Sequence, residues 1–120
     1  MSAKKIVQDF YKSEALINSA ILDTFLHPEF ILEWNSTKGF IQMNRSELLN
    51  FATELGKSYI RSKVRISHIL KDNDLISLKY SHFVKTIENP REEMLLAHFM
   101  VIWEVKDDKL YRGYQMSQLS

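Results

Sequence analysis

The segment Lys63–Val84 (KVRISHILKDNDLISLKYSHFV) contains two runs in which apolar and polar residues alternate. This period of two is typical of β-strands with one buried face, because successive side chains point to opposite faces of a sheet. Between the runs, Asp72-Asn73-Asp74 is a turn-forming triplet. We therefore predict an antiparallel hairpin with one apolar face. In the first strand Val64, Ile66, His68 and Leu70 share one face, and in the second the face predicted to point inward carries Leu78, Tyr80, His82 and Val84.

Upstream of this hairpin the apolar residues recur with helical spacing. Ile6 and Phe10, for example, are four residues apart, which places them on one face of a helix. The helical pattern over residues 1–25 is interrupted near residues 13–18, so we predict two helices with a break between them. Pro28 ends the second helix, because the residue before a proline is disfavoured in the helical conformation.

A third helix has the clearest start signal in the chain. Asn44 is followed three residues later by Glu47, which is the spacing of a capping box. Apolar residues then recur at helical spacing, which predicts a buried stripe along one side of the helix. The members of this stripe are Leu48, Ala52, Leu55 and Tyr59.

Short β-branched and aromatic segments bounded by turn residues predict the remaining strands. They are residues 29–35 with a short partner at 40–43, and two long strands near 93–106 and 109–118. Three helices in the N-terminal half, followed mostly by long antiparallel strands, indicate an α+β fold. In such a fold one curved sheet packs over the helices.

The composition narrows the class of protein. With 120 residues the chain suits one domain, residues 1–120, and its 45% apolar and 26% charged fractions are those of a globular protein. The 16 basic and 15 acidic residues nearly balance, which argues against nucleic acid or a membrane surface as the partner. The sequence has no cysteine, and no apolar stretch reaches the ~18 residues of a membrane span. We therefore expect a cytoplasmic protein.

One predicted strand, Met94–Trp103 (MLLAHFMVIW), is apolar on both faces instead of alternating. Exposing one of these faces would create a large apolar patch, so that face needs a cover. We favour a second copy of the chain, which would form a homodimer through the sheet face. A central strand buried on both faces within one protomer is the alternative. The predicted interface residues are Leu95, Phe99, Val101 and Trp103.

The order of these elements, together with two segments, carries a family resemblance. The segments are FILEWNSTKGF (Phe30–Phe40) and AHFMVIWEVKDDKLYRGYQ (Ala97–Gln115). The whole chain resembles the nuclear transport factor 2-like superfamily, and within it the small bacterial SnoaL-like domains. This resemblance implies a cone-shaped α+β barrel with an apolar cavity, and a dimer formed through the outer sheet face. It implies little about activity, because the superfamily includes isomerases, dehydratases, hydrolases, cyclases and partner-binding proteins.

The resemblance also implies positions for acid–base groups, and this chain has other residue types at most of them. Ketosteroid isomerase-like members use a carboxylate base, a tyrosine and a protonated aspartate, and SnoaL-type cyclases use an aspartate late in the last strand. The matching positions here are Trp34 for the base, Phe10 or Tyr11 for the tyrosine, Met100 or Val101 for the protonated aspartate, and Gln118 for the cyclase aspartate. The chain is therefore expected to lack both known sets of catalytic groups.

Polar residues on the predicted inward faces are the candidates for chemistry. Tyr80 and His82 are two apart on one strand, and His98 shares a face of the next strand with Met100. Histidine is the natural acid or base near neutral pH, since its ordinary pKa is about 6.5. We predict His98 and His82 as bases and Tyr80 as a proton donor. Core histidines that only hydrogen-bond to the backbone or to each other are the alternative.

The predicted ligand-contacting residues are Trp34, Met100, Tyr59 and Gln115. No metal site or cofactor is predicted, because the spacing of the histidines places no two of them on one helix or strand face. We predict a cavity that binds a small apolar or amphipathic molecule, with metal-free proton transfer as its chemistry. The alternative is a dimerisation or protein-interaction module whose cavity is filled by its own side chains. A cavity of roughly 300 Å³ or more would favour ligand binding.

Overall fold

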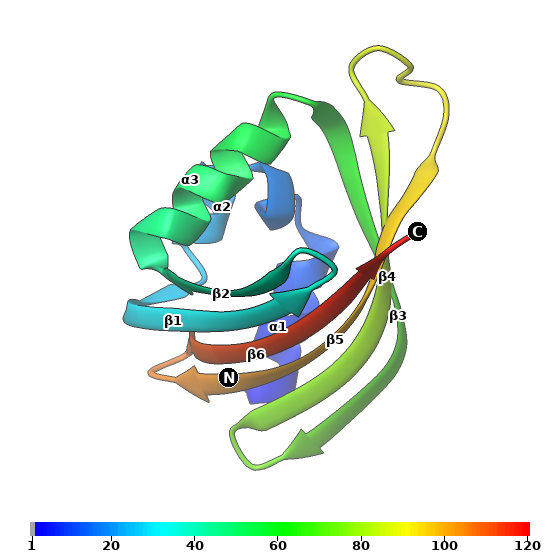
Figure 1. Cartoon of the computed structure of the whole chain (residues 1–120). Helices are drawn as coiled ribbons and strands as arrows, with labels where there is room; N and C mark the ends of the chain where they lie inside the picture. The colour runs from blue at the N-terminus through cyan, green and yellow to red at the C-terminus, as the bar shows by residue number, and fades with distance from the viewer. Residues whose placement is uncertain (1) are drawn as a thin grey trace.

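Six strands form one curved sheet over the part of the chain that the computed structural model describes, residues 2–120. They are β1 (Leu26–Ser36), β2 (Gly39–Asn44), β3 (Tyr59–Asp72), β4 (Leu75–Thr86), β5 (Met94–Lys106) and β6 (Lys109–Leu119). On its concave side lie α1 (Ala3–Lys12), the short 3-10 helix η1 (Ala15–Ile17), α2 (Ser19–Asp23) and α3 (Arg45–Gly56), as Figure 1 shows. This arrangement confirms the predicted α+β fold.

The strand order is β2-β1-β6-β5-β4-β3, and the sheet does not close into a complete barrel. Neighbouring strands are antiparallel except β1 and β6, which run parallel. This parallel pair joins the first strand to the last, so both halves of the chain share one sheet. Asn73, Asp107 and Asp108 have positive φ angles of 55°, 54° and 59° in the turns after β3 and β5. Asparagine and aspartate tolerate this conformation better than most residues, which explains why these turns were predictable.

Local capping interactions fix the ends of the first helices. At the start of α1 the Ser2 hydroxyl oxygen accepts a hydrogen bond from the Lys5 backbone N–H at 3.2 Å. At its end the Ser13 hydroxyl donates to the Phe10 carbonyl at 2.6 Å. Asn18 then caps α2 by accepting from two backbone N–H groups. The predicted break between two N-terminal helices is therefore confirmed.

Helix α3 begins at the predicted capping box, which Asn44 and Glu47 form reciprocally. Its predicted buried stripe is wrong in part. Within α3, Ala52 alone is fully buried, whereas the leucines on that side are half-buried. Tyr59 begins β3 instead of extending the helix. Helix α3 therefore crosses the concave side with its inner face only partly buried.

The β3–β4 hairpin confirms the predicted alternation, with one correction. The residues predicted to face inward from β4 are all buried: Leu78, Tyr80, His82 and Val84. On β3, the pairing with β4 shifts by one residue between Ile66 and His68. Such a bulge adds a residue to one strand and reverses which side chains face inward beyond it. His68 and Leu70 are therefore on the outer face, and Leu70 is 72% exposed.

The faces of β5 are the reverse of those predicted. Phe99, Val101 and Trp103 are buried in the core of the protomer, so they do not form the predicted dimer interface. Met100 and Ile102 alternate with them and lie exposed on the outer face. Because both faces of this strand are apolar, its sequence does not indicate which one points inward.

A bulge at Leu96 places Leu95 on the outer face, unlike the other three predicted interface residues. The pairing of β4 with β5 shifts between the pairs His82–Ala97 and Phe83–Leu95, which leaves Leu96 without a partner in the ladder. Beyond the bulge, Leu95 lies opposite Phe83 on the outer face, whereas Leu96 lines the interior. Of the four predicted interface residues, Leu95 is therefore the one on the outer face.

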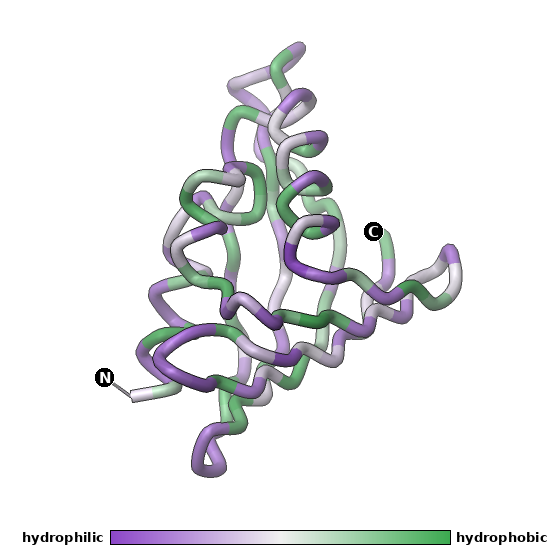
Figure 2. Tube along the Cα trace, turned by 90° about the vertical axis from the view of Figure 1, so that its left-hand side faces the viewer, coloured by the Kyte–Doolittle hydropathy of each residue, from purple (hydrophilic) through white to green (hydrophobic). Residues whose placement is uncertain are grey.

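The packed core occupies one end of the concave side. Figure 2 shows hydrophobic and hydrophilic residues alternating along the strands, as expected for a sheet with two different faces. The largest fully buried side chains come from α1, α2 and the inner face of the sheet: Phe10, Leu22, Phe30, Leu32, Ile76 and Leu110. Among the described residues, no helix is long and apolar enough to cross a membrane.

Candidate functional site

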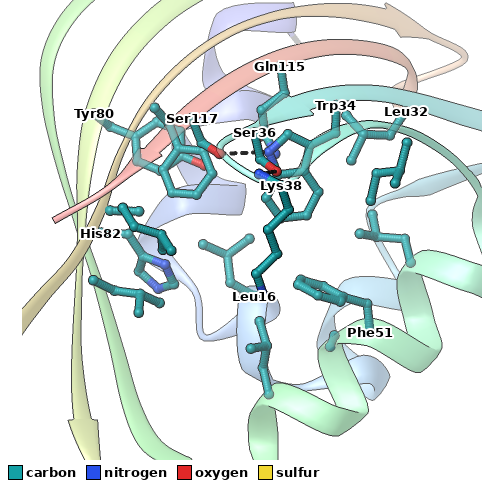
Figure 3. Close-up of a pocket in the computed structure, with 18 of the residues that line it drawn as sticks. Leu16, Leu32, Trp34, Ser36, Lys38, Phe51, Tyr80, His82, Gln115 and Ser117 are labelled. Atoms are coloured by element: carbon teal, nitrogen blue, oxygen red, sulfur yellow. Dashed lines mark hydrogen bonds between the residues drawn. The ribbon is translucent and has the colours of Figure 1, made fainter.

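A cavity of about 430 Å³ lies between α3, η1 and the inner face of the sheet. It adjoins the packed core, because Phe10, Leu22 and Leu32 of that core also border it. Leucine and aromatic side chains make up most of its lining, and a few polar groups project among them. Figure 3 shows Tyr80 and His82 on one side of this space, Trp34 and Gln115 on another, and Phe51 of α3 facing them.

Aromatic rings form the walls of the cavity without filling it. Trp34 meets Phe51 edge-on with ring centroids 5.4 Å apart, and Tyr80 is stacked on Phe99 at 4.8 Å. The Trp34 indole N–H also donates a hydrogen bond to the Ser117 hydroxyl oxygen at 2.8 Å. These contacts hold the rings at the perimeter, which keeps the space between them open.

Two tyrosine hydroxyls lie at the boundary between the core and the cavity. The buried Trp103 indole N–H donates to the Tyr11 hydroxyl oxygen at 2.8 Å, and the Tyr11 and Tyr80 ring centroids are 4.6 Å apart. Burial raises the pKa of both tyrosines, and the neighbouring Tyr11 raises the pKa of Tyr80 further. Both hydroxyls therefore stay protonated at neutral pH and act as neutral hydrogen-bonding groups.

His82 is a buried histidine at the edge of the cavity, and it is 3% exposed. Its Nε2 atom lies 2.7 Å from the hydroxyl oxygen of Ser62 on β3. The Ser62 backbone is held in turn, because its N–H donates to the Glu14 carboxylate at 2.8 Å. Burial lowers the pKa of His82 to about 4, since the charged imidazolium loses its hydration in this apolar site. The ring is therefore neutral at pH 7.

The second ring nitrogen of His82 is available to a ligand. No described residue hydrogen-bonds to Nδ1, whereas Nε2 is bonded to Ser62. Among the described residues, no fully buried side-chain nitrogen or oxygen lacks a partner, so Nδ1 is not sealed within the protein. A neutral imidazole with one accessible nitrogen can accept or donate one hydrogen bond at that atom.

Gln115 is a buried amide-bearing residue of the cavity wall, as the sequence predicted. It is 7% exposed and lies in register between Trp34 of β1 and Val101 of β5. No described residue hydrogen-bonds to its carboxamide, and the amide is not sealed from the cavity. Burying an amide without a partner costs about 1–3 kcal/mol by mutational data. The side chain therefore carries a hydrogen-bonding group that water or a ligand in the cavity can satisfy.

The structure brings together most of the predicted site residues and separates two of them. The predicted residues that line the cavity are Trp34, Tyr59, Tyr80, His82 and Gln115. His98 and Met100 were placed on the wrong face, because the alternation along β5 sends both outward. His98 lies in an exposed pair with Ser81, whose hydroxyl oxygen is 3.0 Å from the histidine Nδ1. A base at His98 is therefore excluded from this cavity.

The sequence pattern did not indicate five polar residues at or beside the cavity: Ser36, Thr37, Lys38, Ser62 and Ser117. Ser117 could have been found by counting two residues on from Gln115. Its neighbour Gln118, which the resemblance matches to the cyclase aspartate, is exposed and points away from the cavity. Lys38 lies in the turn between β1 and β2, and the pattern of a turn does not indicate where its side chains reach.

The chemistry of the lining is that of neutral hydrogen-bonding groups. Among residues 2–120, no three histidine or acidic side chains are close enough together to hold a metal ion. Trp34, which the resemblance matches to the carboxylate base of ketosteroid isomerase-like proteins, has an indole N–H that is a donor and cannot accept a proton. His82 is the lining residue with a nitrogen that can accept a proton at neutral pH.

Neither a protein-family model nor a curated protein matches this sequence. The fold matches solved structures over nearly the whole chain. IdmH, a candidate polyketide cyclase from Streptomyces antibioticus, has a TM-score of 0.75 at 11% identity, over 98% of this chain and 92% of that one. A nuclear transport factor 2-like protein of unknown function from Burkholderia pseudomallei has a TM-score of 0.67 at 12% identity, over 96% and 90%. This chain has the nuclear transport factor 2-like fold.

A third match also has this fold. A SnoaL-like candidate polyketide cyclase from a Jannaschia species has a TM-score of 0.70 at 7% identity, over 96% of this chain and 84% of that one. At such low identity the likeness establishes the nuclear transport factor 2-like fold and leaves the activity to be argued from the cavity.

We expect the stability of the protein to depend on the protonation of His82. Its pKa is about 4 in the folded protein, whereas the pKa of an unfolded histidine is about 6.5. As the pH falls below that value, the unfolded chain binds a proton that the folded protein does not. Stability is therefore complete above about pH 6.5 and is lost progressively as the pH falls to about 4, by roughly 2–3 kcal/mol. Urea unfolding at a series of pH values measures this loss.

The matched variant is His82→Gln, which cannot titrate. Other histidines and the carboxylates contribute equally to both proteins, so the difference between their pH profiles isolates His82. The variant should show a smaller loss of stability on acidification than the wild type. Parallel profiles would contradict a buried, neutral His82.

Proposed function

We propose that this protein binds a small, mostly apolar molecule with at least one polar group in the cavity between α3 and the sheet. The observation that carries this proposal is the unpartnered Gln115 carboxamide in an open cavity of about 430 Å³. Ligand sites are typically apolar hollows of roughly 300–1,000 Å³ with a few polar groups that orient the ligand. The cavity has both properties.

The volume of the cavity favours ligand binding over the alternative of an interaction module. That alternative requires the cone to be filled by its own side chains. The large aromatic residues that were available to fill it, such as Trp34 and Phe51, pack against each other along the wall instead. The space that they leave is larger than the roughly 300 Å³ that separates the two hypotheses.

Proton transfer is the chemistry that these residues support best. A neutral His82 can accept a proton from a bound molecule, as a general base does. Tyr80 and Gln115 supply hydrogen bonds to the negative charge that develops as the proton leaves, and such bonds are stronger in an apolar site than in water. A cyclase or isomerase type of reaction fits this set, and two of the matched structures are candidate polyketide cyclases.

We expect the protein to bind N-phenyl-naphthylamine, a neutral dye whose emission rises in an apolar environment. The Leu55→Trp variant should reduce its affinity by about tenfold or more, since roughly 1.4 kcal/mol of lost contact has that effect. Leu55 is a half-buried lining residue of α3, so the larger ring would occupy the cavity. Fluorescence titration of the two proteins makes the comparison.

The control for this experiment is Leu75→Trp, the same substitution at an exposed leucine outside the cavity. It should bind the dye as the wild type does. If the wild type does not bind the dye, or if the two variants behave alike, the proposal of a ligand-binding cavity is wrong.

We expect the protein to accelerate the opening of nitrobenzisoxazole, a probe of general-base catalysis. In this reaction the base removes the ring C–H proton while the N–O bond breaks to give a cyanophenolate. His82→Phe should lower the rate by about tenfold or more, because a positioned base contributes roughly 10²–10⁴-fold with a well-fitted substrate. Since the pKa of His82 is about 4, the rate should be constant above pH 5 and fall as the pH drops through 4.

The matched control is His98→Phe, which removes the exposed histidine of the outer face. Its rate should equal that of the wild type. Equal losses of rate in the two variants would show that His82 is not the base. The proposal of ligand binding does not depend on that outcome.

We also propose that two copies of the chain associate through the outer face of the sheet. Met100 and Met116 are directly opposite each other on β5 and β6, and so are Ile102 and Tyr114. These four side chains are 42–65% exposed, and together they form a continuous apolar patch at the centre of this face. Such a patch is typical of a protein interface. This proposal keeps the predicted homodimer but builds its interface from other residues than the four predicted ones.

The test is Met116→Lys, since Met116 is 65% exposed and a lysine there does not disturb the core. Sedimentation velocity at micromolar concentration should show a dimer for the wild type and a monomer for this variant. Ile87→Lys, at an exposed isoleucine after β4, should remain dimeric. A monomeric wild type would contradict the proposed association.

A further inference from the structure

We infer that the ligand of this cavity is an anionic amphipathic molecule, whose acidic group pairs with Lys38 at the mouth while its apolar body lies between the aromatic walls. This inference rests on the proposed binding function and specifies the chemical class of the ligand. It depends on where Lys38 is held, on the charge of the other lining residues, and on which polar groups lie deeper in the cavity.

The turn that carries Lys38 is fixed by its own hydrogen bonds. Residues 36–39 connect β1 to β2, with Ser36 paired to Gly39 in the register. The Ser36 hydroxyl oxygen accepts from the Lys38 backbone N–H at 3.1 Å. Gly39 has a φ of 107°, a conformation that residues with a side chain rarely adopt. The turn therefore has a defined shape, and Figure 3 shows the Lys38 side chain extending from it across the pocket towards Leu16.

Lys38 is distinguished from the rest of the lining by its charge. Among the described residues that border the cavity, it is the one that bears a full charge at neutral pH, because His82 is neutral there. No aspartate or glutamate is among those lining residues. Lys5 and Lys57 pair with Asp9 and Glu54 on their own helices. Within residues 2–120, the Lys38 ammonium has no such partner.

An unpaired ammonium at the mouth of an apolar hollow selects for negative charge. The low dielectric of the walls lets the positive potential reach further than it would over an open surface, so an anion is attracted and a cation is repelled. The aliphatic stem of lysine can lie along apolar surface while its ammonium stays near water. A bound carboxylate or sulfonate could therefore keep part of its hydration at the mouth, which limits the cost of desolvating it.

The polar groups deeper in the cavity are uncharged, so they suit a different part of the ligand from the one that Lys38 would bind. Gln115 and His82 are neutral, so they suit a carbonyl, hydroxyl or similar uncharged group. An anion placed at that depth would lose its hydration without meeting a positive charge. The arrangement therefore orients a ligand with its acidic end at the β1–β2 turn and its neutral polar group towards β6 and β4.

The test compares two dyes that differ in one group. Anilinonaphthalene sulfonate carries a sulfonate, whereas N-phenyl-naphthylamine has the same rings without it. Lys38→Met should weaken binding of the anionic dye by about fivefold, the effect of a partly exposed ion pair, and should leave binding of the neutral dye unchanged. Lys38→Arg should retain the affinity for the anionic dye. Lys71→Met, at an exposed lysine of β3 that does not border the cavity, should match the wild type with both dyes.

The outcomes separate this inference from the proposed function. Leu55→Trp identifies the part of each dye signal that comes from the cavity. If neither dye gives such a signal, the proposed function fails and this inference fails with it. If the dyes bind in the cavity and Lys38→Met changes neither affinity, or both equally, the anionic class is wrong and ligand binding stands. The inference is supported if Lys38→Met lowers the affinity for the anionic dye alone. Added salt should then lower the affinity of the wild type for this dye but not that of Lys38→Met.

Discussion

The buried hydrogen bond from the Trp103 indole to the Tyr11 hydroxyl, 2.8 Å long, ties α1 to the middle of the sheet. Trp103 occupies this place because the residue beside it on β6 is Gly113. A Cβ at that position would lie 2.5 Å from the Trp103 ring. Phe10 and Phe30 pack around the same ring, with centroids 5.9 Å and 6.0 Å away. One large side chain thereby organises the packing between α1 and the sheet, and its ring also borders the cavity.

The cavity persists because α3 is held by η1 and α2 and meets the sheet mainly through its Phe51 ring against Trp34. Gly56, at the end of α3, lies so close to η1 that a Cβ there would be 2.5 Å from the Ile17 carbonyl oxygen. This backbone contact sets the position of α3, and Ala52 is its one fully buried residue. The distance that remains between α3 and the strands is occupied by the cavity. The packing around Trp103 and the fixed position of α3 on η1 together leave the space that forms the cavity.

Local chemistry made much of the fold predictable from the sequence. Helix caps, turn residues and the alternation along β4 depend on neighbouring residues, so Asn44 and Tyr80 were placed correctly. The failures came from long-range causes. Two bulges reversed the inward side along β3 and β5, and nothing in the local pattern marks them. His98 was misplaced because an entirely apolar strand has no preferred face. Lys38 was missed because the reach of a turn over a cavity depends on the whole fold.

The polar residues of the cavity make little sense as contributions to stability. Gln115 places an amide without a protein partner against an apolar cavity, and His82 is held neutral by the loss of its hydration. An apolar residue of similar size at position 115 would remove the first cost, whereas at position 82 it would leave the Ser62 hydroxyl without its partner. In a chain whose local patterns otherwise agree with its fold, departures of this kind are expected at functional sites. Both border the same cavity, and the unpaired Lys38 lies across its mouth. A single molecule with an acidic end and a neutral polar group would satisfy all three residues at once.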